Sequence, residues 1–106
     1  MIEALKAYYS GAGWPIITGQ DCDLENMKSI LAGKQAMSVF KDTRILVDRT
    51  VKMVNQILNG QTVEVNGSIT TGSETPAYLC KAVVVDKNNY REYLIESGYY
   101  TEDQLR

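Results

Sequence analysis

The chain contains 106 residues, of which 44% are hydrophobic and 23% charged, and its net charge is −2. This balanced composition is typical of a globular domain and lacks the basic excess of nucleic-acid-binding surfaces. No apolar run approaches the roughly 20 residues that a membrane-spanning helix needs. Two cysteines and no histidine exclude a disulfide framework and the common zinc patterns, and nothing indicates a cofactor.

The N-terminal segment is predicted to contain a helix and then a strand. Apolar residues at helical spacing predict an amphipathic helix over about Ile2–Ser10, ended by Gly11. It lacks the basic start and the cleavage site of a signal peptide. Because the chain begins inside this helix without a capping residue, we expect it to be a piece of a longer protein. The apolar run Ile16–Thr18 predicts the first strand.

A second helix and a second strand follow at close spacing. Asp23 is a suitable N-cap for a helix over Leu24–Ala32, and Gly33 is suited to ending it. The residues Ala36–Phe40 then predict another strand.

The longest predicted helix spans about Arg44–Asn59. Asp42 or Thr43 caps its start, and Gly60 closes it. Six residues give it a broad apolar face: Leu46, Val47, Met53, Val54, Ile57 and Leu58.

The next stretch changes from helical to strand and turn chemistry. Polar and apolar residues alternate over Thr62–Val65, as in a strand with one solvent-exposed face. The Asn66-Gly67 pair is typical of a tight turn, so Ser68–Thr71 is predicted to pair with the preceding strand as a hairpin. Gly72–Pro76 is predicted to be a loop.

The C-terminal segment predicts a strand, a helix and a final short turn. Tyr78–Val85 is a third apolar strand, and Asp86 caps a helix over about Asn88–Glu96. Thr101 and Gln104 match a capping box for one last helical turn.

This alternation of helices and strands predicts an α/β fold, a partial doubly wound parallel sheet with crossover helices. It is partial because three main strands leave long edges unpaired. Two apolar runs, 16–18 and 38–40, each end near a charged residue and lead into a helix. Strand ends of this kind are where α/β proteins place ligands. One run is followed by the acid Asp21 and the other by the base Lys41, a combination suited to a neutral, polyhydroxylated ligand.

The segments 17–24 (ITGQDCDL) and 30–41 (ILAGKQAMSVFK) resemble the C-terminal third of type I periplasmic sugar-binding proteins. The most similar branch is the xylose-binding proteins of ABC transporters. The tail is also similar, at 83–89 (VVVDKNN) and 97–101 (SGYYT). The resemblance covers nearly the whole chain and implies the periplasmic-binding-protein-like I fold, in which two lobes enclose the ligand.

In that family the aspartate of the G-Q-D motif and the lysine of the V-[YF]-K motif hydrogen-bond the sugar. Carried over, these are Asp21 and Lys41. Spacing alone leaves open that Asp21 is a loop acid near a helix N-terminus and that Lys41 is a solvated lysine. The resemblance implies binding of a monosaccharide, an aldose such as xylose, without catalysis.

The resemblance also implies partners and a location. The parent protein would be periplasmic or at the cell surface and would dock an ABC permease or a membrane sensor. The expected partner of the chain itself is the missing N-terminal lobe or a second copy of the chain. No nucleic-acid partner is expected.

Some features depart from the family pattern. The strand that supplies another sugar-binding acid would precede Met1, and Asp42 and Ala82 stand where prolines are usual. Because such proteins cross between lobes several times, we expect the third and the last helix to belong to the other lobe. Residues 1–106 would then be one incomplete C-terminal segment that contributes to both lobes.

Other candidate residues have simpler interpretations. Asp23 is better explained as a helix cap than as a ligand. Asp21 and Asp23 lie two positions apart in a loop and Asp23 serves as a cap, which disfavours a glycosidase carboxylate pair. Trp14 precedes a strand and is expected to pack. Cys22 and Cys80 are expected to be unpaired thiols used for packing.

Two regulatory alternatives share the two-lobed fold. One is a sugar-sensing subunit for a membrane histidine kinase, which these residues do not distinguish from a transport protein. The other is the effector-binding part of a LacI-type repressor, which usually carries a G-[FY]-D-D motif where this chain has Gly19-Gln20-Asp21.

Overall fold

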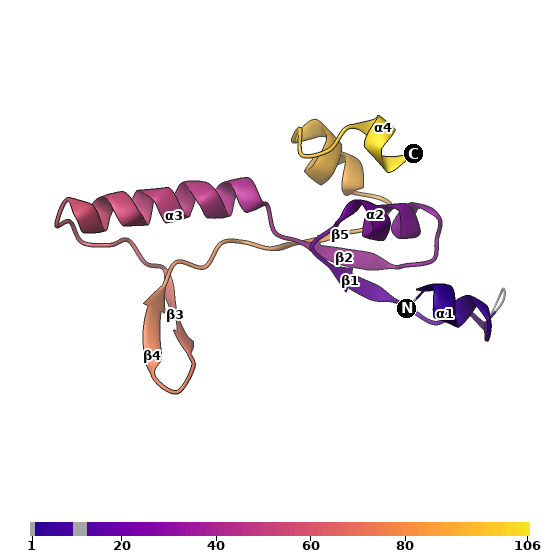
Figure 1. Cartoon of the computed structure of the whole chain (residues 1–106), viewed down its shortest axis with the longest axis horizontal. Coiled ribbons are helices and arrows are strands. Elements are labelled where there is room, and N and C mark those ends of the chain that lie inside the picture. The colour runs from indigo at the N-terminus through magenta and orange to yellow at the C-terminus, as the bar shows by residue number, and fades with distance from the viewer. Residues whose placement is uncertain (1, 10–12) are drawn as a thin grey trace. The chain divides into compact units, whose positions relative to one another are not determined.

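The computed structural model describes residues 2–9 and 13–106. It divides the chain into two compact units whose elements are labelled in Figure 1. Unit 1 comprises Met1–Phe40 and Val83–Arg106, and unit 2 comprises Lys41–Ala82. Among the described residues no helix has both the length and the apolar character to cross a membrane.

Unit 1 is built on a three-stranded sheet with the order β1-β2-β5. These strands span Thr18–Gln20, Met37–Phe40 and Val83–Val85. The α/β class is therefore confirmed. The prediction of a wholly parallel sheet is wrong, because β1 and β2 are parallel but β5 is antiparallel to β2. The chain leaves unit 1 after Phe40, at the end of β2, and re-enters it at Val83, the first residue of β5. Because Phe40 and Val83 pair with each other, β5 runs antiparallel to β2.

The first strand lies two residues later than predicted. Ile16 is 87% exposed, whereas Ile17 is buried, and the carbonyl of Ile17 accepts a hydrogen bond from the Ala36 N–H at 2.8 Å. Pairing with β2 continues through Gly19 and Gln20. The partner strand therefore decides the boundary and overrides the weak strand propensity of glycine.

Two short helices, α1 and α2, belong to unit 1. Helix α1 spans Ile2–Lys6 and ends earlier than predicted; the predicted ending at Ser10 and Gly11 lies outside the described residues. Helix α2 spans Leu24–Leu31, and the carboxylate of Asp23 accepts the Asn26 N–H at 2.8 Å. The predicted cap is therefore confirmed.

The C-terminal segment forms a helix and a final short helical turn, as predicted, but the first of these begins later and has a different winding. Asp86 accepts the N–H groups of Asn88 and Asn89, but the helix that follows, η2 (Arg91–Glu96), has the wider winding of a π-helix. The capping box forms: the Thr101 N–H donates to Gln104 Oε1 at 2.8 Å and begins α4 (Glu102–Leu105). Both helices lie in unit 1, so the expectation that the last helix belongs with the third is wrong.

The core of unit 1 joins α2, the sheet and the C-terminal helices. Phe40, at the end of β2, packs edge-to-face on Tyr99, with ring centroids 4.8 Å apart. Such a pair adds to the free energy gained by burying the rings. Seven buried residues form this core: Cys22, Met27, Ile30, Phe40, Val85, Leu94 and Leu105. The last helices stay in unit 1 because their apolar residues complete this core.

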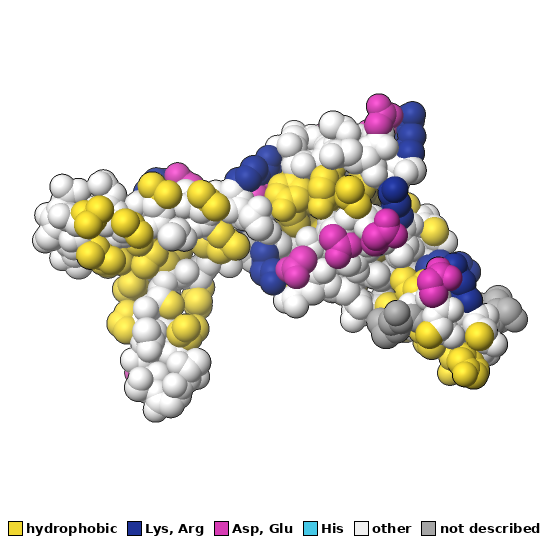
Figure 2. Space-filling view, in the orientation of Figure 1, with side chains coloured by type: hydrophobic (Ala, Val, Ile, Leu, Met, Phe, Trp, Pro, Cys, Tyr) yellow, Lys and Arg dark blue, Asp and Glu magenta, His cyan; other side chains and the backbone are white. Residues whose placement is uncertain are grey.

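Unit 2 consists of one long helix and a hairpin. Helix α3 spans Thr43–Leu58, and its predicted cap is confirmed because Asp42 accepts the Arg44 N–H at 2.9 Å. No residue of α3 is buried. Its apolar face is open, with Ile57 63% and Leu58 79% exposed, and hydrophobic side chains show along this helix in Figure 2.

The hairpin lies further along the chain than predicted. Its strands are β3 (Gly67–Thr70) and β4 (Glu74–Ala77), so part of the predicted loop is a strand. The turn forms around Gly72, whose φ is +90°. Asn66, predicted to be in the turn, instead holds the base of the hairpin, because its side-chain amide bonds both the N–H and the carbonyl of Leu79.

Two predicted strands are absent or shortened because their residues contact other parts of unit 2. Glu64, in the predicted strand Thr62–Val65, forms an ion pair with Arg49 of α3 at 2.6 Å. The guanidinium of Arg49 also lies over the Tyr78 ring, 3.6 Å from its centroid. Residues 78–82 are therefore outside β5, and only the last three residues of the predicted strand pair with β2.

The alternation of buried and exposed side chains along β5 can be tested with two neighbouring valines. Val85 is fully buried and Val84 is 53% exposed. We expect Val85→Ala to lower the free energy of unfolding by about 1.5–3 kcal/mol, because a buried valine contributes that much. Val84→Ala is the matched control and should have a much smaller effect. Urea denaturation measures both, and equal losses would contradict the observed register.

The α3 cap predicts a pH dependence. Hydrogen bonding to Arg44 lowers the pKa of Asp42 below its ordinary value. A lowered folded-state pKa adds stability above the unfolded pKa of about 4, and this is lost as pH falls through the folded value. We therefore expect Asp42→Asn to lose less helix stability than the wild type between pH 5 and pH 2, measured by circular dichroism in urea. Asp48→Asn removes a more exposed carboxylate of α3 and is the control for a general charge effect; the same pH profile in both variants would contradict the role of the cap.

Candidate functional site

The two predicted ligands directly follow the two parallel strands. Asp21 comes after β1 and Lys41 comes after β2. In the register of the pair, Gln20 lies opposite Val39, so both strands end at the same edge of the sheet. The carboxyl ends of parallel strands are the usual position for ligand-binding side chains. Asp21 is exposed and Lys41 is half-buried.

The backbone at Asp21 has an unusual conformation. Asp21 has φ +76° and Cys22 has φ +50°. Two successive residues other than glycine rarely adopt this left-handed region, and such strain gathers at functional sites. The turn is fixed to β2 because the Asp21 N–H donates to the Val39 carbonyl at 2.7 Å and the Cys22 N–H donates to Ser38 Oγ at 3.1 Å.

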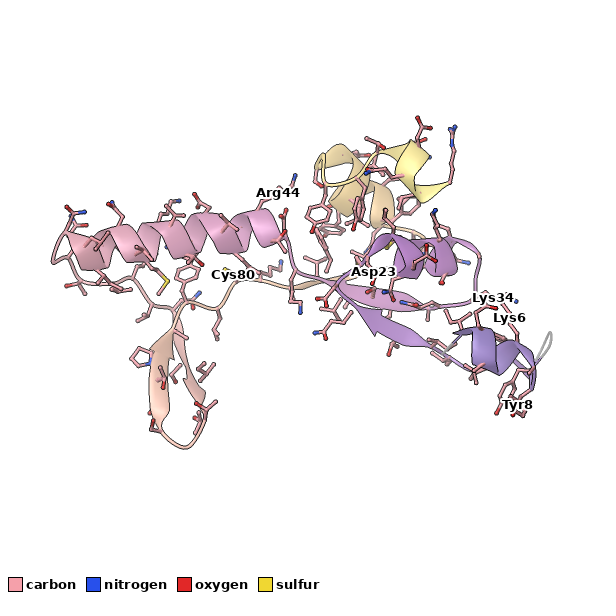
Figure 3. The ribbon with its side chains drawn as sticks, viewed as in Figure 1. Lys6, Tyr8, Asp23, Lys34, Arg44 and Cys80 are labelled. Atoms are coloured by element: carbon pink, nitrogen blue, oxygen red, sulfur yellow. The ribbon has the colours of Figure 1, made fainter. Side chains whose placement is uncertain are left out.

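A chain of polar side chains supports the same loop. Asp23, labelled at the start of α2 in Figure 3, accepts hydrogen bonds from both the N–H and the side-chain amide of Asn26. Asn26 Oδ1 in turn accepts from Gln35 Nε2 at 2.8 Å, and Gln35 is buried. The backbone of Gly19 passes directly beneath this pair. These contacts explain Asp23 as the N-cap of α2.

Sequence reasoning missed the supporting residues Asn26, Gln35 and Ser38. Gln35 and Ser38 are polar residues that are nevertheless buried. Their positions in or next to an apolar strand were only a weak indication of burial, because a polar residue in a strand is usually on its solvent-facing side.

The remaining candidates behave as packing residues. Trp14 donates its indole N–H to the Lys34 carbonyl at 2.9 Å, and the Lys34 ammonium lies 4.7 Å from the ring centroid. Burial raises the pKa of the Cys22 thiol more than its hydrogen bond to Ser38 lowers it, which disfavours the reactive thiolate. Cys22 and Cys80 are both unpaired.

A hollow of about 440 Å³ in unit 1 is lined in part by Gly19, Asn26 and Gln35, the residues that support the Asp21 loop. Its lining also includes residues of α1 and other residues of α2, but not Asp21. It is open rather than enclosed, so we base the candidate site on the strand ends instead.

Comparison with known proteins identifies the family. No protein-family model matches the chain. It is 44% identical over its whole length to the multiple sugar-binding periplasmic receptor ChvE of Rhizobium radiobacter, of which it covers 32%. It is 50% identical to the multiple sugar-binding periplasmic protein SbpA of Azospirillum brasilense, over 87% of the chain and 26% of that relative. The chain therefore spans between about a quarter and a third of the relatives it matches.

A solved structure agrees with these sequence matches. An ABC transporter solute-binding protein from Clostridium phytofermentans with bound β-D-glucose superposes with a TM-score of 0.89 and 52% identity. The match covers 99% of this chain and 33% of that one. The relatives of this chain are periplasmic sugar-binding proteins, and the chain matches one segment of them. The predicted family and its periplasmic-binding-protein-like fold are thus confirmed, and the relatives are named as sugar-binding proteins rather than enzymes.

The close approach at Gly19 gives a direct test of the loop's packing in this sugar-binding-protein segment. A Cβ at Gly19 would lie inside van der Waals contact with Gln35 Nε2 and Asn26 Oδ1. We therefore expect Gly19→Ala to destabilise the chain by about 1–3 kcal/mol through overpacking. Thermal unfolding measures the effect.

Gly13→Ala is the matched control, because its Cβ would meet only Tyr9 Cδ1 at 3.9 Å, an ordinary contact. If the two alanine variants unfolded at the same temperature, the packing of Gly19 against the amide pair would be contradicted.

Proposed function

We propose that this chain is part of the monosaccharide-binding site of an extracytoplasmic solute-binding protein that serves an ABC transporter. The observation that carries the proposal is the strained turn at Asp21, fixed at the carboxyl end of β1 beside the strand that precedes Lys41. The names of the relatives, which include multiple sugar-binding proteins and a glucose-bound structure, support a sugar as the ligand.

Asp21 and Lys41 have complementary roles in this proposal. An ionised carboxylate accepts hydrogen bonds from two sugar hydroxyl groups, and an ammonium group donates to hydroxyl oxygens. Such charge-assisted bonds are stronger than those between neutral groups. Opposite charges on the two ligands suit an uncharged aldose such as glucose or xylose.

The rest of the site would come from the remainder of the protein. The chain spans about a third of its relatives, and we propose that it is the C-terminal segment of a two-lobed protein. The open apolar face of α3 supports this, because exposed apolar surface of that extent usually marks a contact surface. Docking to a permease or to a membrane sensor would be a property of the complete protein.

A hybrid protein tests this function. In the hybrid, this chain replaces the matching third of the Clostridium phytofermentans glucose-binding protein, to which it is 52% identical. Isothermal titration measures binding of D-glucose and D-xylose. We expect Asp21→Asn and Lys41→Met each to weaken binding by about tenfold to a hundredfold, the equivalent of about 1.5–3 kcal/mol for one charge-assisted bond.

Two controls accompany the hybrid. Asp23→Asn removes a nearby charge but can retain the helix cap, so it should leave the affinity nearly unchanged. The isolated chain should bind sugar weakly or not at all. Unchanged affinity in both the Asp21 and Lys41 variants, or micromolar binding by the isolated chain, would contradict the proposed site.

A further inference from the structure

The turn that carries Asp21 is attached to the sheet through a buried serine. Ser38 and Cys22 are both 0% exposed, and the Cys22 N–H donates to Ser38 Oγ at 3.1 Å. A buried backbone N–H needs a partner. Water does not reach this position to replace the hydroxyl, so Ser38 satisfies a group that would otherwise be left without a hydrogen bond.

Ser38 is itself fixed from both sides. It lies in the central strand of unit 1, opposite Gly19 of β1 and opposite Val85 of β5. The strand order prevents β2 from shifting without breaking two ladders. The hydroxyl is therefore a fixed point against which the turn is held.

The two hydrogen bonds of the turn respond differently to mutation. The bond from the Asp21 N–H to the Val39 carbonyl joins two backbone groups and survives any change of side chain. The bond to Ser38 comes one residue later, at Cys22, and depends on the hydroxyl. Without it, Cys22 can leave the left-handed region, and the orientation of the neighbouring Asp21 changes with it.

We propose that Ser38 is a positioning residue for sugar recognition. Its hydroxyl locks the left-handed Asp21–Cys22 turn and so holds the carboxylate of Asp21 in the orientation that accepts hydrogen bonds from the sugar. This inference rests on the proposed function, because it requires Asp21 to be a sugar ligand.

The first experiment measures the lock itself in the 106-residue chain. Amide hydrogen exchange by NMR compares the wild type with Ser38→Ala, Ser38→Thr and Ser29→Ala. Ser29 is a half-buried serine of α2 and provides the matched control. We expect Ser38→Ala to speed exchange of the Cys22 amide by about tenfold or more while the amides of α2 stay protected. Ser38→Thr, which keeps the hydroxyl, and Ser29→Ala should both preserve the protection.

The second experiment measures glucose affinity in the hybrid protein. We expect Ser38→Ala to weaken binding by roughly tenfold and Ser38→Thr to restore it. In an Asp21→Asn background, Ser38→Ala should cause little further loss, because two residues that act through one contact are not additive. Unfolding curves check that each variant remains folded.

The outcomes separate this inference from the function on which it rests. Unchanged exchange at Cys22 in Ser38→Ala overturns the lock. Faster exchange with unchanged affinity, while Asp21→Asn still loses binding, overturns the positioning role but leaves the proposed function intact. Unchanged affinity in Ser38→Ala and Asp21→Asn overturns the positioning role, and unchanged affinity in Lys41→Met as well overturns the proposed function. An additional loss from Ser38→Ala in the Asp21→Asn background also overturns the positioning role, because Ser38 would then act independently of Asp21.

Discussion

The parallel pairing of β1 with β2 is the contact on which the rest of unit 1 depends. It begins at the carbonyl of Ile17 and continues to the N–H of Asp21. Because the strands are parallel and in this register, both end at one edge of the sheet. The same pairing brings the backbone of Gly19 beneath the amide groups of Gln35 and Asn26. Strand pairing, loop support and the candidate ligand position are therefore parts of one structure.

The antiparallel return of β5 explains how two units share one chain. The chain leaves unit 1 after Phe40 and re-enters at Val83, and these residues pair with each other. The core can therefore close across the interruption, with Leu94 and Tyr99 packed around Phe40 and Val85. Helix α3, by contrast, buries none of its residues. The segment is thus well packed around the candidate site and open along α3.

Local signals predicted the caps and the ends of α2 and α3 to within one residue, because capping depends on residues only two or three positions apart. Asp23 and Asp42 cap the helices that the sequence assigned to them. The predicted position of Asp21 after a strand also follows from local pattern and resemblance. The hairpin was placed wrongly, because the Asn66-Gly67 signal competed with a contact from Asn66 to Leu79, 13 residues away. No local pattern reveals such a contact.

The sequence by itself determined the α/β class, the helix caps, the family and the two candidate ligands, since each follows from short-range spacing or from a contiguous motif. Only the tertiary structure decided the direction of β5, the unit to which the last helices belong and the buried position of Ser38 and Gln35. These depend on pairing and burial between segments far apart in the chain. A polar residue in a strand looks the same in sequence whether it faces water or supports a turn, and only its neighbours in space distinguish the two.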